Sequence, residues 1–308
     1  MSRVLKIKSD IYLRVVENKA KFFAVTLLAT IIALGFLFFR GLNYGIDFKG
    51  GLNVEIQTMD GDADIAALRS KLNDAGIVGA SLQEFGSKNN VLIKMEAMQN
   101  DTDGSLVLQK LKDALGPNVK YRNIESVGPK VGKQLQHESA IAVFFALLAI
   151  LLYIWIRMDW QFGLCGVIAL IHDCIIVLGF FAIFHSFEFN IASVCAILMT
   201  AGYSINDTVV IFDRMNENIR YQKFKDLTDL INRSISETLT RTILTSGTTI
   251  MALLCLCIFG GDVISSYATP MLIGIVTGTF SSIFIASPLL TLIGINLNNK
   301  NQEAVSAK

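Results

Sequence analysis

Charged residues are scarce in this chain of 308 residues. Lysine, arginine, aspartate and glutamate together make up 17% of it, whereas hydrophobic residues make up 52%. Soluble globular domains carry about 25% charged residues, so this composition argues against a soluble protein. The formal net charge is only +1, and the basic residues gather at the ends of apolar segments. The charge therefore gives no indication of a nucleic-acid partner, and none is expected.

The residue groups that mark enzymes and metal sites are also missing from the sequence. All five cysteines fall inside apolar runs, without metal-ligand partners nearby: Cys165, Cys174, Cys195, Cys255 and Cys257. Disulfides and zinc sites are therefore not expected, and small residues that fill space between membrane helices are the simpler interpretation. The sequence has no nucleotide-binding loop either. We expect neither enzyme activity nor a bound metal or cofactor.

Six long apolar segments predict transmembrane helices, since a spanning helix needs about 20 apolar residues. They cover approximately residues 22–40, 138–156, 163–184, 191–212, 242–259 and 268–293. The first segment is not expected to be a cleaved signal, because it ends in Phe36 to Arg40 and not in small residues. Six spans place both termini on one side of the membrane.

The distribution of lysine and arginine predicts which side that is. Both residue types are frequent before the first segment and between the fourth and fifth, whereas the links at 186–189 and 260–267 contain neither. Short loops rich in these residues stay in the cytoplasm. We therefore expect residues 1–21, the link 213–240 and the tail 294–308 to be cytoplasmic. Residues 41–137 are then predicted to be periplasmic.

This insert alternates two kinds of element. The residue patterns predict strands at 52–58, 80–85, 91–95 and 119–126, helices at 63–75 and 105–115, and a turn at 86–90. The order β-α-β-β-α-β is the split ferredoxin-like pattern, in which two helices cover one face of an antiparallel sheet. The predicted fold class is thus an α-helical polytopic membrane protein with one α+β ferredoxin-like periplasmic domain.

Asp207 is the most informative residue, because it lies in the otherwise apolar segment 191–212. A carboxylate in hydrocarbon is unfavourable by roughly 2.5–3.5 kcal/mol, so it persists where it lines a pathway or meets a partner. Small residues recur every fourth position beside it and predict close helix packing: Ala192, Ala196, Thr200, Ser204 and Thr208. Tyr203, Ser204 and Asn206 are its expected polar neighbours. We favour a proton or ion site; the alternative is a structural carboxylate bound by serine and threonine.

Arg241 is a candidate partner for Asp207. It is expected at the start of the fifth span, where Thr245 and Thr248 extend a polar face into the membrane from the same side. An ionised Asp207 would pair with the guanidinium and a protonated one would release it, since arginine stays charged. The alternative is that Arg241 reaches the lipid headgroups.

A third polar position is formed by His172 and Asp173, midway along segment 163–184. Neighbouring residues on a helix point about 100° apart, so both cannot face one partner equally. Asp173 is the stronger candidate for a proton relay or an inter-helix bond, and for His172 functional and structural roles remain equally open. Asp213 and Arg214, where segment 191–212 leaves the membrane, are expected to form a solvated ion pair or a topology anchor.

Two further patterns concern packing. Small residues four apart in the last segment predict a tightly packed ridge: Gly274, Gly278, Ser282 and Ala286. In the link 213–240, apolar residues at helical spacing predict an amphipathic helix on the membrane surface: Phe224, Leu227, Leu230, Ile231 and Ile235.

Four motifs together resemble the SecD/SecF family of bacterial protein-export subunits. They are GLNYGIDFKGG at 41–51, HD at 172–173, GYSINDTVVIFDR at 202–214 and RTILTSGTT at 241–249. The resemblance covers essentially the entire chain. Because the larger first exported domain of SecD is missing, the chain resembles the smaller SecF type of subunit more than SecD or a fused SecDF chain.

The resemblance implies a resistance-nodulation-division (RND) fold in the bacterial inner membrane. It further implies action with SecD beside the SecYEG channel and the associated YajC and YidC, driven by the proton-motive force, to help preproteins leave on the outer side. Asp207 and Arg241 match positions implicated in proton conduction, and Asp173 matches a family motif. The junction residues Gly45, Asp47, Gly50 and Gly51 are expected to shape the entry into the exported domain, since glycine permits turns that other residues resist.

Two other readings remain. An RND exporter of small molecules or lipids would also use an aspartate in the membrane, but it would need two six-helix halves and usually two exported domains. A non-transporting scaffold subunit would only bind a client through its exported domain.

Overall fold

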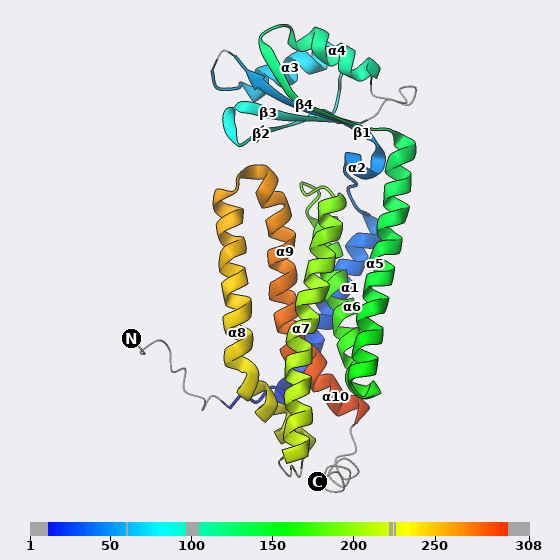
Figure 1. Cartoon of the computed structure of the whole chain (residues 1–308), viewed down its shortest axis with the longest axis vertical. Helices are drawn as coiled ribbons and strands as arrows, with labels where there is room; N and C mark the ends of the chain where they lie inside the picture. Colours follow the sequence, from blue (N-terminus) through cyan, green and yellow to red (C-terminus); the bar gives the residue numbers. More distant parts are fainter. Residues whose placement is uncertain (1–11, 60, 97–104, 222–223, 225, 295–308) are drawn as a thin grey trace, which may run out of the picture.

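The computed structural model describes residues 12–59, 61–96, 105–221, 224 and 226–294. The described chain forms a helical bundle with a small α/β domain above one end (Figure 1). Six helical segments are long and apolar enough to cross a membrane, which confirms the predicted number of spans. They are α1 (Lys19–Phe39), α5 (Pro129–Arg157), α6 (Trp160–Ile183), α7 (Ile191–Tyr221), α8 (Leu227–Phe259) and a last span that joins α9 (Gly261–Ser281), η2 (Ser282–Ala286) and α10 (Ser287–Ile293).

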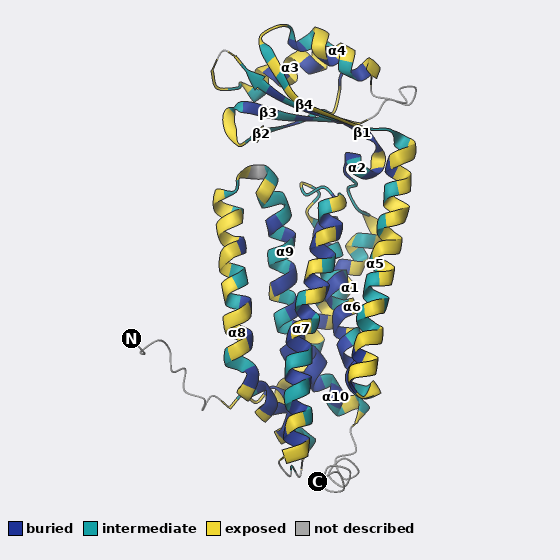
Figure 2. Cartoon of the chain, viewed as in Figure 1, coloured by how far each residue is buried: buried dark blue, intermediate teal, exposed yellow. Residues whose placement is uncertain are grey.

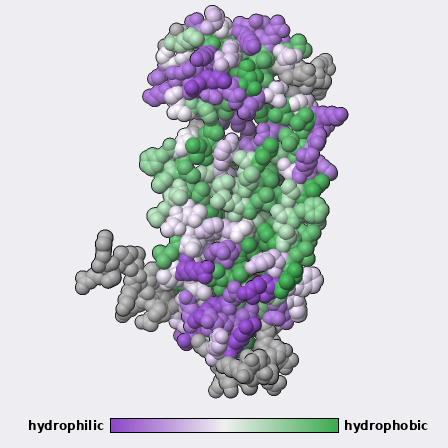
Figure 3. Space-filling model, in the orientation of Figure 1, coloured by the Kyte–Doolittle hydropathy of each residue, from purple (hydrophilic) through white to green (hydrophobic). Residues whose placement is uncertain are grey.

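The spans divide into an inner and an outer set. Dark blue buried residues concentrate in α6, α7 and the last span, whereas α1, α5 and α8 carry long exposed stretches (Figure 2). Many exposed residues are large and apolar, for example Leu28, Phe144 and Ile258. On the face seen in Figure 3, a hydrophobic belt therefore covers the bundle between two hydrophilic ends. Such a belt is the surface expected in contact with lipid, and the chain is a multi-pass membrane protein.

The α/β domain contains one antiparallel sheet. Its elements are β1 (Gly51–Thr58), α3 (Ile65–Asp74), β2 (Ser81–Phe85), β3 (Ser87–Glu96), α4 (Ser105–Leu115) and β4 (Val119–Val127). The strand order β2-β3-β1-β4 confirms the predicted ferredoxin-like arrangement. Alternate residues of β1, namely Leu52, Val54 and Ile56, are buried in the core with residues of both helices. Both helices lie on the face away from the bundle, and the other face looks toward it (Figure 1).

The hairpin between β2 and β3 is tighter than predicted. Gly86 alone separates the two strands, and its positive φ of 75° suits glycine. Residues 87–90, expected in the turn, belong to β3, where Asn90 pairs with Gln57 of β1. The prediction placed the strand at the first apolar residue, because the polar residues before it resemble a turn in composition.

The link 213–240 also differs from the prediction. α7 continues to Tyr221, and α8 runs without interruption from Leu227 to Phe259. Leu230, Ile231 and Ile235 are fully buried, and the last two pack in one core cluster with residues of α6 and α7. The expectation of a separate helix on the membrane surface is therefore wrong, because its apolar face packs inside the protein.

Candidate functional site

The two small-residue stripes predicted on separate spans face each other. α7 and α9 approach so closely that a Cβ atom on Gly278 would lie 2.9 Å from the Cβ atom of Ser204. Thr200 packs in the same way on Gly274. One turn further, the hydroxyls of Thr208 and Ser282 lie 2.8 Å apart. This contact brings hydroxyl-bearing residues of both helices into the centre of the bundle.

Asp207 lies within the bundle, with 2% of its surface exposed. Its Oδ2 accepts a hydrogen bond of 3.1 Å from Ser246 Oγ on α8. Ser246 Oγ in turn accepts one of 2.8 Å from Thr279 Oγ1 on α9. Asp207 is thus connected to two neighbouring spans through a short chain of hydroxyls.

Arg241 does not pair with Asp207 in this structure. It is exposed, and the described residues contain no ion pair of its guanidinium. It also lies well inside α8 and does not begin the helix. Thr245 and Thr248 are exposed as well, and both hydroxyls donate to carbonyls of their own helix. The three predicted polar residues therefore form an outward face of α8, while Ser246 faces Asp207.

Asp173 occupies a second buried site and has no exposed surface. Its Oδ2 accepts hydrogen bonds from Ser204 Oγ at 2.5 Å and from Ser281 Oγ at 2.6 Å. Its Oδ1 lies 3.0 Å from His172 Nδ1. The carboxylate thus joins α6 to α7 and α9. The predicted neighbour of Asp207, Ser204, belongs to Asp173 instead.

The other predicted neighbours of Asp207 point elsewhere. The phenol of Tyr203 donates to the carbonyl of Thr245 at 2.7 Å and lies 2.9 Å from Thr249 Oγ1, so it joins α7 to α8. Asn206 is exposed. Sequence reasoning missed Ser246, Thr279 and Ser281, although Ser246 lies one turn after Thr242 on a face whose hydroxyls recur every four residues. Which hydroxyl meets which carboxylate depends on how each packed helix is rotated about its own axis.

The junction motif connects the α/β domain to the outer end of α7. The amide of Gly45 donates to the Phe189 carbonyl at 2.9 Å, and Asp47 Oδ2 accepts from the Ile191 amide at 3.2 Å. Asp47 belongs to a short helix, α2 (Ile46–Lys49). After it, Gly50 has a φ of 84°, and an added Cβ would lie 2.7 Å from Pro129 Cα. Gly51 leaves similarly little room, beside the Met95 carbonyl. Both glycines are therefore required by the close approach of the chain to itself.

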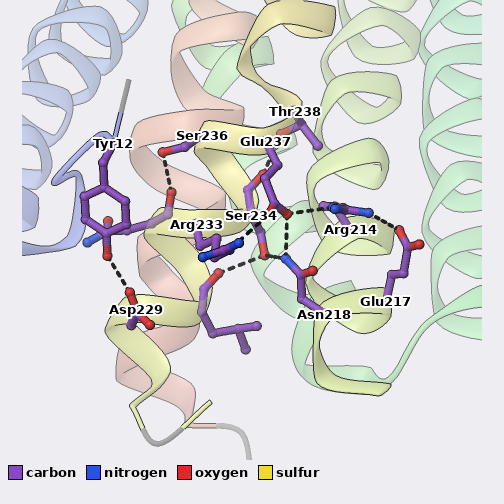
Figure 4. Close-up of polar contacts among 12 residues, drawn as sticks. Tyr12, Arg214, Glu217, Asn218, Asp229, Arg233, Ser234, Ser236, Glu237 and Thr238 are labelled. Carbon is purple, nitrogen blue, oxygen red and sulfur yellow. Dashed lines mark hydrogen bonds and ion pairs between the residues drawn. The ribbon is translucent and has the colours of Figure 1, made fainter. Parts of the chain in front are cut away.

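A third polar group lies at the end of the bundle opposite the α/β domain (Figure 4). Arg214 binds Glu237 at 2.7 Å and Glu217 at 2.6 Å, while Asp213 lies 3.4 Å from Arg157. The expected pair of Asp213 with Arg214 is thus replaced by separate partners. These contacts join the ends of α5, α7 and α8.

The residues before α1 are fixed to the same end. Tyr12 donates to Asp229 at 2.6 Å (Figure 4). The amide of Leu13 donates to Ser236 at 3.0 Å. The hydrogen bond to Asp229, followed by burial, raises the pKa of the Tyr12 phenol. Its contribution to stability is therefore present below the ordinary pKa of tyrosine and is lost as the pH rises through the raised value.

The parts of the chain that the structure describes contain no cluster of three or more histidine, cysteine or acidic residues that could hold a metal ion. The buried carboxylates are surrounded by hydroxyl groups, which can donate to a charged carboxylate and also accept from a protonated one. The hydrogen-bond partners therefore suit both the charged and the protonated form of each carboxylate.

Comparisons with known proteins agree with these features. The family model for the C-terminal part of the protein export membrane proteins SecD/SecF matches residues 107–296, which include both buried carboxylates. The model of the SecD/SecF GG motif matches residues 35–58, which include the junction. Protein translocase subunit SecF of Rickettsia bellii is 39% identical over 292 residues, 91% of this chain and 96% of the relative. SecF of Rickettsia akari is 40% identical over 286 residues, 92% of each chain.

Solved structures show the same similarity. SecDF from Thermus thermophilus, described as a translocon-associated membrane protein, matches with a TM-score of 0.79 and 32% identity over 93% of this chain. SecDF in a super-membrane-facing form matches with a TM-score of 0.70 and 32% identity over 97% of this chain. The chain spans only 39% and 40% of those longer chains.

Proposed function

Because the chain belongs to the SecD/SecF family of protein export membrane proteins, we propose that it is a SecF-type accessory subunit of the Sec translocase. In this proposal it works with SecD, uses the proton-motive force and promotes preprotein export across the bacterial inner membrane. Its termini lie in the cytoplasm and the α/β domain in the periplasm. SecYEG, YajC, YidC and the translocating preprotein are its further partners.

The burial of Asp207 between three membrane helices carries this proposal. A carboxylate at this depth can change its charge only by exchanging a proton, and that exchange alters its bond to Ser246 on α8. One elementary charge that crosses the membrane potential supplies about 2.3 kcal/mol per 100 mV. Such energy can shift the balance between two helix arrangements if the carboxylate favours one of them.

Arg241 and Asp173 have separate roles in the proposed mechanism. Arg241 is a positive charge on the same helix as Ser246, and we assign its pairing with Asp207 to a second arrangement of α7 and α8. Asp173 lies on α6 and shares the helix α9 with the Asp207 network. Both carboxylates thus act on one set of packed helices.

The outward polar face of α8 supports the proposed partnership with SecD. Arg241, Thr245 and Thr248 are exposed on α8, a helix long and apolar enough to cross a membrane. Polar groups exposed to lipid are unfavourable, so a neighbouring protein is the better cover for this face. The similar SecDF chains are also more than twice as long as this one, which fits a function that needs a second half.

Replacement of Asp207 by Asn tests the proposal. Asn cannot exchange a proton at neutral pH, so cells whose only copy carries Asp207→Asn should lose the export that depends on the proton-motive force. The measurement is the rate of preprotein export into inverted membrane vesicles, with and without a proton gradient. Asp213→Asn is the matched control, because Asp213 lies on the same helix but is exposed and pairs at the surface with Arg157. Normal gradient-dependent export by the Asp207 variant would favour the scaffold function instead.

A further inference from the structure

One short stretch of the last span contacts both carboxylate networks. Ser281 donates directly to Asp173 at 2.6 Å. Two positions earlier, Thr279 donates to Ser246 at 2.8 Å, and Ser246 donates to Asp207. Asp173 and Asp207 lie on different helices, α6 and α7, and both networks contact the segment 279–282, which ends α9 and begins η2.

A π-helical turn follows directly and determines which hydroxyls face inward. η2 spans Ser282–Ala286, and both Ser281 and Ser282 are fully buried. In a regular α-helix, neighbouring side chains point about 100° apart. Because both Ser281 and Ser282 are buried, protein covers more than one side of the helix at this point. Ser281 reaches Asp173 on α6, whereas Ser282 reaches Thr208 and the Ser204 carbonyl on α7.

Pro288 provides a local reason for this turn. It lies at the start of α10 and has no amide hydrogen to donate to the Phe284 carbonyl, and its ring would press against that carbonyl in a regular helix. A π-turn relieves this contact by widening the helix. π-turns inside α-helices are found frequently at functional sites. Here the turn directly follows the residues that contact both carboxylate networks.

We propose that Ser281 and Thr279 are positioning residues that couple the two carboxylates, so that a proton gained or lost at Asp173 changes proton binding at Asp207, and the reverse. This inference rests on the proposed function, because it assumes that Asp207 exchanges protons. When Asp173 changes its charge, its bond to Ser281 changes and the segment 279–282 moves. Thr279 then alters the position of Ser246 and hence the environment of Asp207. Coupling of this kind is reciprocal by thermodynamic necessity.

Each carboxylate has further polar and titratable neighbours. Asp207 faces Ser246 from α8 and the hydroxyl of Thr279 from α9, and Arg241 is the charged residue of α8 that acts on it. Asp173 faces Ser204 from α7 and Ser281 from α9, with His172 and the thiol of Cys174 as its titratable neighbours on α6. Ser281 and Thr279 lie on α9, which contacts both sites, and Ser204 lies on α7, the helix of Asp207 itself.

Infrared difference spectroscopy of the full chain, reconstituted with SecD in liposomes, tests the coupling. The carboxyl bands are recorded as the pH is changed, and Asp173→Asn and Asp207→Asn assign them to their residues. Ser281→Ala removes a donor from Asp173 only. If the sites are coupled, it should also move the titration midpoint of Asp207 by about 0.7 pH unit or more, which is the fivefold lower end of usual coupling. Ser281→Thr, which keeps the hydroxyl, should restore the midpoint.

Two further variants make the result decisive. Thr279→Val should move the Asp173 band although Thr279 does not touch that residue, and this reciprocal shift serves if Ser281→Ala fails to fold. Thr238→Val is the matched control, because Thr238 is also buried but donates only to carbonyls of its own helix, α8; it should leave both bands unchanged. An Asp207 band that titrates but ignores Ser281→Ala and Thr279→Val would overturn the coupling alone. An Asp207 that does not titrate near neutral pH would overturn both the coupling and the proposed function.

Discussion

At the scale of single residues, two glycines of α9 allow the helices that form the carboxylate sites to pack closely. Gly274 and Gly278 of α9 allow Thr200 and Ser204 of α7 to approach the helix backbone. Ser204 then reaches Asp173 with a hydrogen bond of 2.5 Å. Any larger residue at position 278 would separate the helices that supply hydroxyls to the carboxylates.

Gly278→Ala should therefore destabilise the bundle. The added Cβ would lie 2.9 Å from Ser204 Cβ and 3.2 Å from Ser204 Cα, so backbone has to move. Overpacking of this kind is unfavourable by about 1–3 kcal/mol. The measurement is the free energy of unfolding in detergent, compared with Gly247→Ala, where nothing in the described structure lies within 4 Å of the new Cβ. The second change Ser204→Gly should recover part of the loss, and equal stability of both alanine variants would contradict the packing argument.

The sequence indicates the carboxylates well and their partners poorly. Asp173 and Asp207 stand out because each is an acidic residue inside an apolar run. The donor to Asp207, however, is Ser246 and not its neighbour Thr245. Adjacent residues of a helix differ by about 100° in direction, so only the packed helices select between them. The π-turn that follows Ser281 has no clear periodic signal either.

At the scale of elements, hydropathy finds the spans but not their ends. The sequence predicts a span at 138–156, whereas α5 begins at Pro129, which suits the first turn of a helix. It also predicts that residues after 212 leave the bundle, whereas α7 and α8 extend beyond the apolar region and pack on each other. Hydropathy identifies helices that contact lipid. It does not identify these extensions, because they are covered by protein and not by lipid. The strands of the α/β domain were easier to predict, because their apolar residues alternate toward one core.

A buried side chain of α8 binds two backbone amides of the segment that precedes α1. Asn232 is fully buried, and its Oδ1 accepts from the amides of Val15 at 3.0 Å and Val16 at 3.1 Å. Asn232→Ala would leave two amides without an acceptor, each unfavourable by about 1–3 kcal/mol. We expect faster amide hydrogen exchange at Val15 and Val16. Arg233→Ala, at a half-exposed neighbouring position paired with Glu237, is the control, and equal exchange in both variants would show that Asn232 does not anchor the helix.

At the scale of the whole molecule, the function proposed above requires that the bundle and the α/β domain act on each other. They meet at the junction at residues 45–51, at the direct connection from β4 to α5, and at the open face of the sheet. A cavity of about 210 Å³ lies between this face and the bundle. It is lined on the domain side by Gln83 and Lys94, among others, and on the bundle side by Glu188, Ser266 and Tyr267. A polar, incompletely filled contact is easier to separate than a packed apolar one.

An ion pair between Lys94 of β3 and Glu188 of the α6–α7 link crosses this contact. The charged atoms lie 2.9 Å apart, and both side chains are largely buried. Glu188 lies next to Phe189, which binds Gly45 of the junction. A movement of α7 during proton exchange would therefore reach the sheet through this pair. A hydrogen bond between charged groups stabilises the docked state by about 1.5–3 kcal/mol.

Charge reversal tests whether this pair holds the domain on the bundle. Lys94→Glu and Glu188→Lys should each lower the ratio of docked to undocked molecules by roughly tenfold or more, since about 1.5–3 kcal/mol is lost, and the double variant should restore it. The docked state is measured by the rate of disulfide formation between Gln83→Cys and Ser266→Cys, which line opposite sides of the cavity, in a chain without its own cysteines. Arg122→Glu is the control, because Arg122 pairs with Glu55 inside the sheet and outside the junction. If the single reversals cross-link as fast as this control, then the pair does not hold the domain on the bundle, and the junction at residues 45–51 and the connection from β4 to α5 are sufficient to do so.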